Sequence, residues 1–373
     1  MDFGLSEEQQ QLKTSAREFL AGECPTTEVR KAMASDDGTL AALYDGIAKL
    51  GWHGLMVPEQ FGGAGLGMLD MTVLLEEAGW AAMPGPFLFS SVLAAGALKL
   101  GGSDRLNAKF LAAVAEGTAT GSLAIVESGD SLAAADIAMT AKKDGAGWRL
   151  SGTKMFVPYA NLADFVIVAA RTASASDAIG FFLVETKSPG VRIKMMKNLD
   201  LTRRVATLEL EGAAAAPDGE LKGGAAMLAR MIDIGALAVA ADSLGGSERA
   251  LEMAVDYSKV REQFGKPIGS FQALKHAAAE IVADLEPARA LLWYAAYAHD
   301  AVPASAPRAA AMAKARLSDI YSRTTDRAVL MHGGIGFTWE HDIHLWFKRA
   351  RFNEPYFGSP SYHRERVAQL GGY

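Results

Sequence analysis

The stretch YSKVREQFGKPIGSFQ, residues 257–272, decides the fold of the C-terminal half of this chain. Apolar or small residues recur every three or four positions before and at its start, which marks one buried helix face: Leu251, Ala254, Val255 and Ser258. Gly265 is expected to end this helix, and Pro267 prevents its continuation. An apolar, Ala-rich run begins at Phe271. The stretch therefore predicts a tight helix–loop–helix corner.

Two side chains at this corner suggest a ligand. Arg261 and Phe264 are three residues apart, so in a last helical turn they lie on one side. Arginine offers a planar fork of donors that suits a phosphate or carboxylate, and phenylalanine offers a ring for stacking. Together they predict a nucleotide-like cofactor. For an isolated R-x-x-F-G motif, an exposed arginine beside a core phenylalanine is the more frequent outcome.

Composition limits the classes of protein. With 373 residues the chain has room for two or three domains. The net charge of −6 without a long basic run argues against a nucleic-acid partner. Cys24 is the only cysteine, so no internal disulfide forms and a reducing cytoplasm is expected. No basic, apolar leader and no long uncharged apolar stretch is evident, so we expect a cytoplasmic protein without a membrane span.

The hydrophobic pattern changes twice along the chain. Residues 1–120 show helical periodicity and predict an N-terminal helical domain. Residues 121–222 contain short β-rich runs between Gly, Asn, Asp, Ser and Pro, which predict a middle antiparallel sheet or small barrel. Residues 223–373 return to long helices. The fold class is therefore α+β, mainly α. The expected strands are 148–150, 154–157, 164–170, 178–184, 191–195 and 206–210, and the expected long helices are 225–260, 271–301 and 306–331.

Four segments, in this order, resemble the acyl-CoA dehydrogenase family: residues 5–10, 57–65, 261–272 and 332–337. The resemblance covers essentially the whole chain and implies a C-terminal four-helix bundle. It also implies a flavoprotein oxidoreductase that oxidises the Cα–Cβ bond of an acyl-CoA. In this family a glutamate removes the α-proton, FAD accepts the β-hydride, and an electron-transfer flavoprotein accepts the electrons.

The resemblance divides the FAD contacts into two groups, and the first group reaches across to the FAD of a neighbouring subunit. Arg261, Phe264 and Gln272 match this group at the corner, and Gly333, Gly334 and Gly336 match it in a later loop. Glycines let backbone N–H groups approach a pyrophosphate closely. Leu330 replaces the family's glutamine at the head of that loop. A helix C-cap followed by a turn is the alternative explanation of the glycines.

The second group holds the flavin of the same subunit in the family, and this chain lacks several of its residues. The family's T-E-P-x-x-G-S-D segment is VESGDS here, residues 126–131, without the threonine hydroxyl. The family's W-I-T-N segment is FVPY, residues 156–159. Pro158 replaces the threonine that supports the flavin edge, and proline has neither an N–H nor a hydroxyl to donate.

The expected catalytic base is missing as well. The family's Y-E-G-T segment is aligned with residues 356–359, where Phe357 stands at the position of the glutamate and cannot accept a proton. Relatives with the glutamate on an earlier helix would place it at Gly235. Asp233 and Glu354 lie close in sequence to the two positions and are weak candidates, since charged side chains are usually solvated.

These observations lead to one hypothesis and two alternatives. The chain is expected to be the non-catalytic subunit of a hetero-oligomeric acyl-CoA dehydrogenase, contributing half of an FAD site to a second acyl-CoA dehydrogenase subunit. Residues 337–342 and 361–368 resemble a branch acting on steroid side chains or other bulky acyl-CoAs. Alternatively, the chain is a self-sufficient homo-oligomeric enzyme with a displaced base. A flavin-free binding or scaffold protein with the same fold is the third interpretation.

Overall fold

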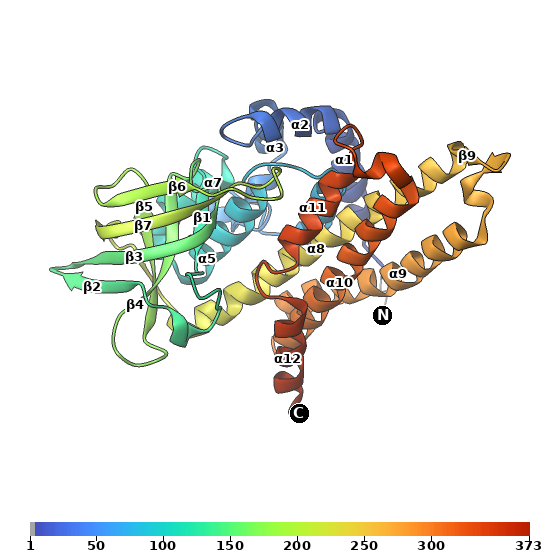
Figure 1. Cartoon of the computed structure of the whole chain (residues 1–373). Helices are drawn as coiled ribbons and strands as arrows, with labels where there is room; N and C mark the ends of the chain where they lie inside the picture. The colour runs from blue at the N-terminus through green and yellow to red at the C-terminus, as the bar shows by residue number, and fades with distance from the viewer. Residues whose placement is uncertain (1–3) are drawn as a thin grey trace. The chain divides into compact units, whose positions relative to one another are not determined.

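Helices occupy both ends of the sequence and a sheet occupies its middle (Figure 1), as predicted. The computed structural model describes residues 4–373. Contacts divide the chain into two units. The first unit contains residues 1–30, 68–83 and 236–373, and the second contains residues 31–67 and 84–235. This grouping does not follow the expected boundaries at residues 120 and 222, so the three-domain division stays a prediction.

The first unit is helical apart from one small hairpin. Its long helices begin and end within one or two residues of their predicted bounds. Two of the helices, α2 and α8, continue into the second unit. The elements are α1 (Glu7–Glu23), α2 (Thr26–Ala34), α4 (Met68–Trp80), α8 (Gly224–Val260), β9 (Glu262–Gln263), β10 (Lys266–Pro267), η6 (Ile268–Ser270), α9 (Gln272–Ala301), α10 (Ala306–His332), η7 (Gly333–Phe337), α11 (Ile343–Asn353) and α12 (Pro360–Gly371).

Local sequence explains where α1 begins. Ser6 is its N-cap: the Ser6 hydroxyl accepts from the Gln9 amide at 3.3 Å, and the Gln9 side chain accepts from the Ser6 amide at 3.1 Å. This reciprocal capping box satisfies two amides that have no partner inside the helix.

Helix α8 is long and apolar enough to cross a membrane by length and composition alone, with a mean hydropathy of 1.6 over its most apolar window. That window is 72% buried inside the protein, which is typical of the core helix of a globular fold.

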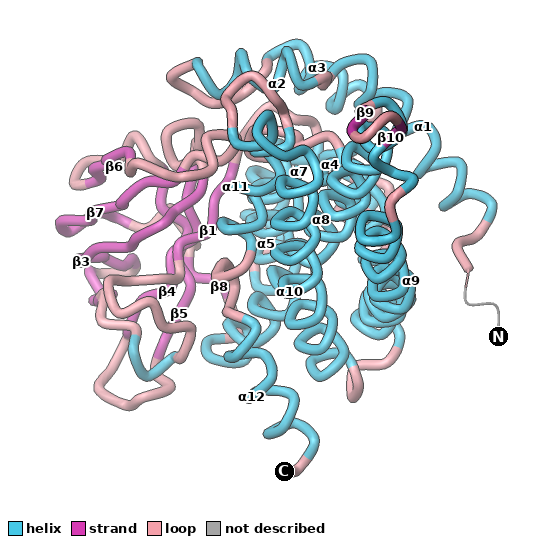
Figure 2. Tube along the Cα trace, turned by 45° about the vertical axis from the view of Figure 1, so that its right-hand side comes forward, coloured by secondary structure: helices cyan, strands magenta, loops and turns pink. Residues whose placement is uncertain are grey.

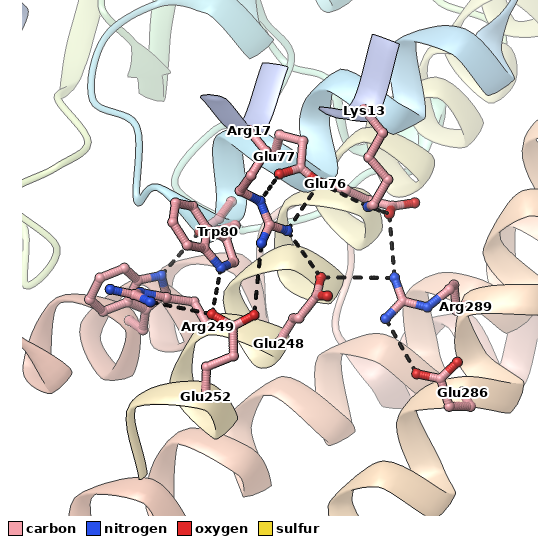
Figure 3. A network of polar contacts seen from close by, with 12 residues as sticks. Lys13, Arg17, Glu76, Glu77, Trp80, Glu248, Arg249, Glu252, Glu286 and Arg289 are labelled. Carbon is pink, nitrogen blue, oxygen red and sulfur yellow. Dashed lines mark hydrogen bonds and ion pairs between the residues drawn. The ribbon is translucent and has the colours of Figure 1, made fainter. Parts of the chain in front are cut away.

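A network of charged side chains joins four helices of the first unit (Figure 3). Glu76 on α4 is fully buried, lies 2.7 Å from Lys13 Nζ on α1, and accepts from Trp293 Nε1 on α9 at 2.6 Å. Its neighbour Glu77 is also fully buried and pairs with Lys13 and Arg17 on α1. Because each buried carboxylate has basic partners, the desolvation cost of burying these charges is largely offset.

The second unit combines short helices with one sheet, whose magenta strands lie together in Figure 2. Its helical elements are α3 (Ala41–Lys49), η1 (Trp52–Gly54), η2 (Glu59–Phe61), η3 (Leu88–Ala94), α5 (Ala95–Gly101), α6 (Asp104–Leu106), η4 (Asn107–Leu111), α7 (Ala112–Ala115) and η5 (Ala134–Asp136). Its strands are β1 (Gly121–Ala124), β2 (Thr140–Asp144), β3 (Gly147–Pro158), β4 (Phe165–Arg171), β5 (Ile179–Glu185), β6 (Val191–Met195), β7 (Val205–Ala214) and β8 (Glu220–Leu221).

The strand order is β6-β7-β3-β2-β4-β5-β8, with β1 paired to β4. Most neighbours are antiparallel, as expected, but β1 runs parallel to β4 and β2 makes one parallel contact with β4. The two runs predicted at 148–150 and 154–157 form the single strand β3, which has an irregularity between Lys154 and Val157 in its pairing with β7. Such a bulge re-aims the side chains of a strand.

Candidate functional site

The corner after α8 is a β-hairpin, so the prediction that Gly265 ends the helix is wrong. Helix α8 ends at Val260, and the pair Gln263–Lys266 closes a two-residue turn of Phe264 and Gly265. Both turn residues have positive φ, +54° and +76°, as a type I′ turn requires. The usual sequence signal for this turn is Asn-Gly or Asp-Gly, and Phe264-Gly265 does not carry it.

The hairpin presents its side chains to the outside of the chain. Phe264 is 91% exposed, and its ring meets that of Phe271 edge-on, with centroids 6.0 Å apart. Arg261, the first residue after α8, is exposed, as is Gln272 at the start of α9. A bulky residue with positive φ is strained, and such strain is concentrated at functional sites such as ligand clamps. The hairpin therefore suits a ligand or chain that approaches from outside.

The three glycines of the later loop have different local reasons. Gly333 ends α10 with φ +63° and ψ −141°, a conformation that only glycine adopts readily. A Cβ at Gly336 would lie 2.6 Å from the Val329 carbonyl, so packing explains this glycine. A Cβ at Gly334 would meet nothing within 4 Å, and Gly334 is exposed. Only at Gly334 does the described structure leave the absence of a side chain unexplained, which fits close approach of a ligand to the backbone.

The segments resembling the family's same-subunit flavin contacts are engaged within the second unit. Glu127 accepts from Lys154 Nζ at 2.7 Å and from the amides of Ala138 and Met139 at 3.0 Å. These bonds lower the pKa of Glu127 against the opposing effect of its burial. Burial lowers the pKa of Lys154 to about 8. The pair therefore fixes the loop after β1, and Glu127 is occupied by its own chain.

The end of β3 turns its polar groups inward. The Pro158 carbonyl accepts from the Ser122 hydroxyl at 2.6 Å. The Tyr159 side chain is fully buried, where its hydroxyl accepts from the Gly85 amide at 2.7 Å and donates to the Thr202 carbonyl at 2.9 Å. Neither residue offers a donor to a flavin edge.

The position of the family glutamate is apolar. Phe357 is 7% exposed with φ +57°, and its carbonyl accepts from His363 Nε2 at 2.8 Å. Glu354 is half-buried and accepts from the Ser322 hydroxyl at 2.8 Å, with Arg351 at 3.5 Å. Asp233 is buried in the part of α8 that belongs to the second unit. The described structure thus gives Glu354 partners other than a substrate.

The structure also shows residues that the sequence did not reveal. Lys154 is one, and a ring cluster of Tyr257, His332 and His341 is another. In this cluster the His332 ring centroid lies 4.8 Å from that of Tyr257 and 4.2 Å from that of His341. The cluster brings the last turn of α8, just before Arg261, next to the residue before Gly333. No periodicity links residues so far apart in the sequence, so only the fold exposes this relation.

Comparison with known families matches the three parts of the chain separately. The acyl-CoA dehydrogenase N-terminal, middle and C-terminal domain models match residues 6–118, 122–212 and 222–371. The chain belongs to the acyl-CoA dehydrogenase family. Members of this family are FAD-dependent oxidoreductases that act on CH–CH bonds.

Relatives match over nearly their whole length. "Acyl-CoA dehydrogenase IpdE2" of Mycolicibacterium smegmatis is 32% identical over 368 residues, which cover 98% of both chains. "Caffeyl-CoA reductase-Etf complex subunit CarC" of Acetobacterium woodii is 30% identical and 95% of each chain is covered.

Two solved structures extend the comparison. A variant of the Tcur3481-Tcur3483 steroid ACAD is similar with a TM-score of 0.89, 32% identity and 98% coverage of both chains. The ChsE4-ChsE5 complex from Mycobacterium tuberculosis is similar with a TM-score of 0.92 and 29% identity, covering 100% of this chain and 99% of that one.

The residues present fit FAD unequally. Arg261, Phe264 and Gly334 are exposed, and a Cβ at Gly334 would meet nothing within 4 Å. The segments at Glu127 and Pro158 instead have their polar groups satisfied internally. The chain thus has exposed groups that could hold a dinucleotide seated outside it, whereas Pro158 and Tyr159 offer no donor to one seated in its own sheet.

Proposed function

We propose that this chain is the non-catalytic subunit of a hetero-oligomeric acyl-CoA dehydrogenase. In this proposal Arg261, Phe264, Gln272 and the Gly333–Gly336 loop contact FAD that is seated in a second acyl-CoA dehydrogenase subunit. That subunit provides the glutamate base and the remaining flavin contacts. The contrast between an exposed hairpin tip and an apolar residue at position 357 carries the proposal.

Each residue of the exposed group has a defined task. Arg261 is suited to bind a phosphate through its guanidinium fork, and the Phe264 ring is suited to stack on a flat ring. Gly334 permits close approach of a pyrophosphate to backbone amides. FAD, when bound, accepts the hydride from the β-carbon of the acyl-CoA. This chain holds and orients that cofactor and takes no proton from the substrate.

Similar proteins support the assignment of partners. The names ChsE4-ChsE5 and Tcur3481-Tcur3483 each combine two components. The Tcur3481-Tcur3483 protein is named as a steroid ACAD. We therefore infer a bulky acyl-CoA, such as a steroid side-chain thioester, as the substrate of the assembly. The CarC relative belongs to an Etf complex, and an electron-transfer flavoprotein is the acceptor that we infer.

The test compares the chain alone with the chain co-expressed with the product of the neighbouring gene. We expect no flavin absorption from the chain alone, and FAD with acyl-CoA oxidation from the complex. Arg261→Ala should weaken FAD binding by the complex about tenfold or more, because a charge-assisted hydrogen bond contributes about 1.5–3 kcal/mol. Arg105→Ala, which removes an exposed arginine paired with Asp218 in the second unit, is the matched control. Stoichiometric FAD and turnover in the chain alone would refute the proposal.

A further inference from the structure

The exposed residues that are proposed to contact the dinucleotide belong to two segments that are far apart in the sequence. Arg261 and Phe264 follow α8, whereas the glycine loop follows α10. One dinucleotide contacts both only if their separation is fixed, since misplacement by about 1 Å costs a large part of a binding interaction. This inference rests on the proposed function.

We propose that Tyr257, His332 and His341 are positioning residues that fix this separation. Tyr257 lies four residues before Arg261, about one helical turn away. His332 is the last residue of α10 and directly precedes Gly333. The two rings lie 4.8 Å apart with an angle of 31° between their planes. The ring contact therefore joins the end of α8 to the start of the glycine loop.

Both histidine rings have fixed orientations. His332 is 2% exposed, and its Nδ1–H donates to the Ala328 carbonyl at 2.7 Å. Burial lowers the pKa of His332, although the carbonyls of Ala328 and Met253 favour its charged form. His341 Nδ1 accepts from the Ile343 amide at 3.1 Å, and its ring lies 4.2 Å from that of His332. Hydrogen bonds and packing thus leave these rings little freedom to move.

The loop beyond the glycines is held at further points. Arg30 lies 2.7 Å from the Asp342 carboxylate and donates to the Trp339 carbonyl at 2.8 Å. The Trp339 ring stacks on His344 with centroids 4.4 Å apart and an angle of 7°. These contacts hold residues 339–344, while Gly333 and Gly334 stay exposed. Such an arrangement pre-organises a binding loop by supporting it from behind.

The test measures FAD affinity in the purified two-subunit complex with five variants of this chain. His332→Ala removes the ring, and His332→Phe keeps a ring of similar size. Leu317→Ala is the matched control, because Leu317 is a fully buried residue of the same helix, roughly 22 Å from His332 along its axis. Arg261→Ala alone and combined with His332→Ala completes a double-mutant cycle.

We expect His332→Ala to weaken FAD binding about tenfold or more, and His332→Phe to weaken it less. Leu317→Ala should lower the melting temperature at least as much as His332→Ala but leave the FAD dissociation constant within about twofold. The double variant should lose clearly less affinity than the product of the two single losses, because His332 acts through the placement of Arg261 and the loop.

Two contrary results have different meanings. If Arg261→Ala leaves FAD affinity unchanged, the proposed function fails and the positioning role fails with it. The positioning role alone is refuted if Arg261→Ala weakens FAD binding but His332→Ala, like Leu317→Ala, lowers the melting temperature without weakening FAD binding. It is also refuted if the losses of FAD affinity in His332→Ala and Arg261→Ala are additive.

Discussion

Two side chains decide whether this chain has a base of its own. Asp233 is buried, and Glu354 accepts a hydrogen bond from Ser322 and faces Arg351. We expect Asp233→Asn and Glu354→Gln to leave kcat of the two-subunit complex within about twofold. A true general base would cost about 10²–10⁴-fold when removed. Steady-state oxidation of an acyl-CoA by each complex measures this, and a loss of that size in either variant would restore the displaced-base alternative.

Acid sensitivity also belongs to single residues. His53 is 7% exposed and its Nδ1 lies 2.7 Å from the Ser91 hydroxyl. Burial lowers the pKa of His53 from 6.5 to about 4, so the unfolded chain takes up the proton first. The stability from keeping this ring neutral is complete above about pH 6.5 and is lost as the pH falls towards 4, by up to about 3 kcal/mol.

Urea unfolding of the wild type and of His53→Phe at pH 7 and pH 5 checks this dependence. The variant should lose less stability between the two pH values, although it starts lower because the hydrogen bond to Ser91 is gone. His363, whose pKa burial also lowers to about 4, accounts for part of the remaining slope. An unchanged difference between the two pH values in His53→Phe would contradict the assignment.

Among the helices of the first unit, a charge network connects α1, α4, α8 and α9 (Figure 3). Replacing Glu76 by Ala removes the buried carboxylate that Lys13 and Arg289 share and leaves Trp293 Nε1 without its acceptor, although Glu77 still pairs with Lys13. We expect a loss of about 1–3 kcal/mol in the free energy of unfolding, as for other buried polar groups that lose a partner. Lys109→Ala, which removes an exposed pair with Glu185, should cost less than about 1 kcal/mol. Equal effects in denaturant unfolding would mean that the network contributes little.

The long helices and most strands of this fold can be predicted from the sequence because each has a strong local signal. Ser6 and Gln9 form the expected capping box, and the run 191–195 is strand β6 as predicted. The short β1, β2 and β8 were missed, since strands of two to five residues have little periodicity and are defined by their pairing with β4, β3 and β5. Tertiary partners, absent from local sequence, set these elements.

The candidate site, like the fold, could be predicted from the sequence only in part. Arg261, Phe264 and the glycines were found because they form short contiguous motifs, although the hairpin that carries Phe264 was taken for a helix end. The pairing of Lys154 with Glu127 and the ring cluster at His332 were not found, because their members lie far apart in the sequence. Motifs thus predict candidate contact residues, while the residues packed behind them emerge only from the fold.

For the whole molecule, the proposal fixes how much flavin the assembly holds. One FAD site of the assembly combines the exposed group of this chain with the flavin seat of the second subunit. In the other possible site, FAD would be seated in the sheet of this chain and contacted by the second subunit. There Pro158 has no donor and the Tyr159 side chain is buried in the core. We therefore expect one FAD for each pair of unlike chains, where a homo-oligomer of complete subunits would hold one FAD per chain.

Native mass spectrometry of the complex, together with the flavin absorbance per mass of protein, measures this ratio directly. Equal numbers of the two chains with half as many flavins as chains is the expected result. Adding Arg261→Ala to this chain should lower flavin retention at every site in the assembly, since each site of this kind uses the same arginine. A ratio of one flavin per chain, or an unaffected half of the flavin in the Arg261 variant, would place a second, working flavin seat in this chain.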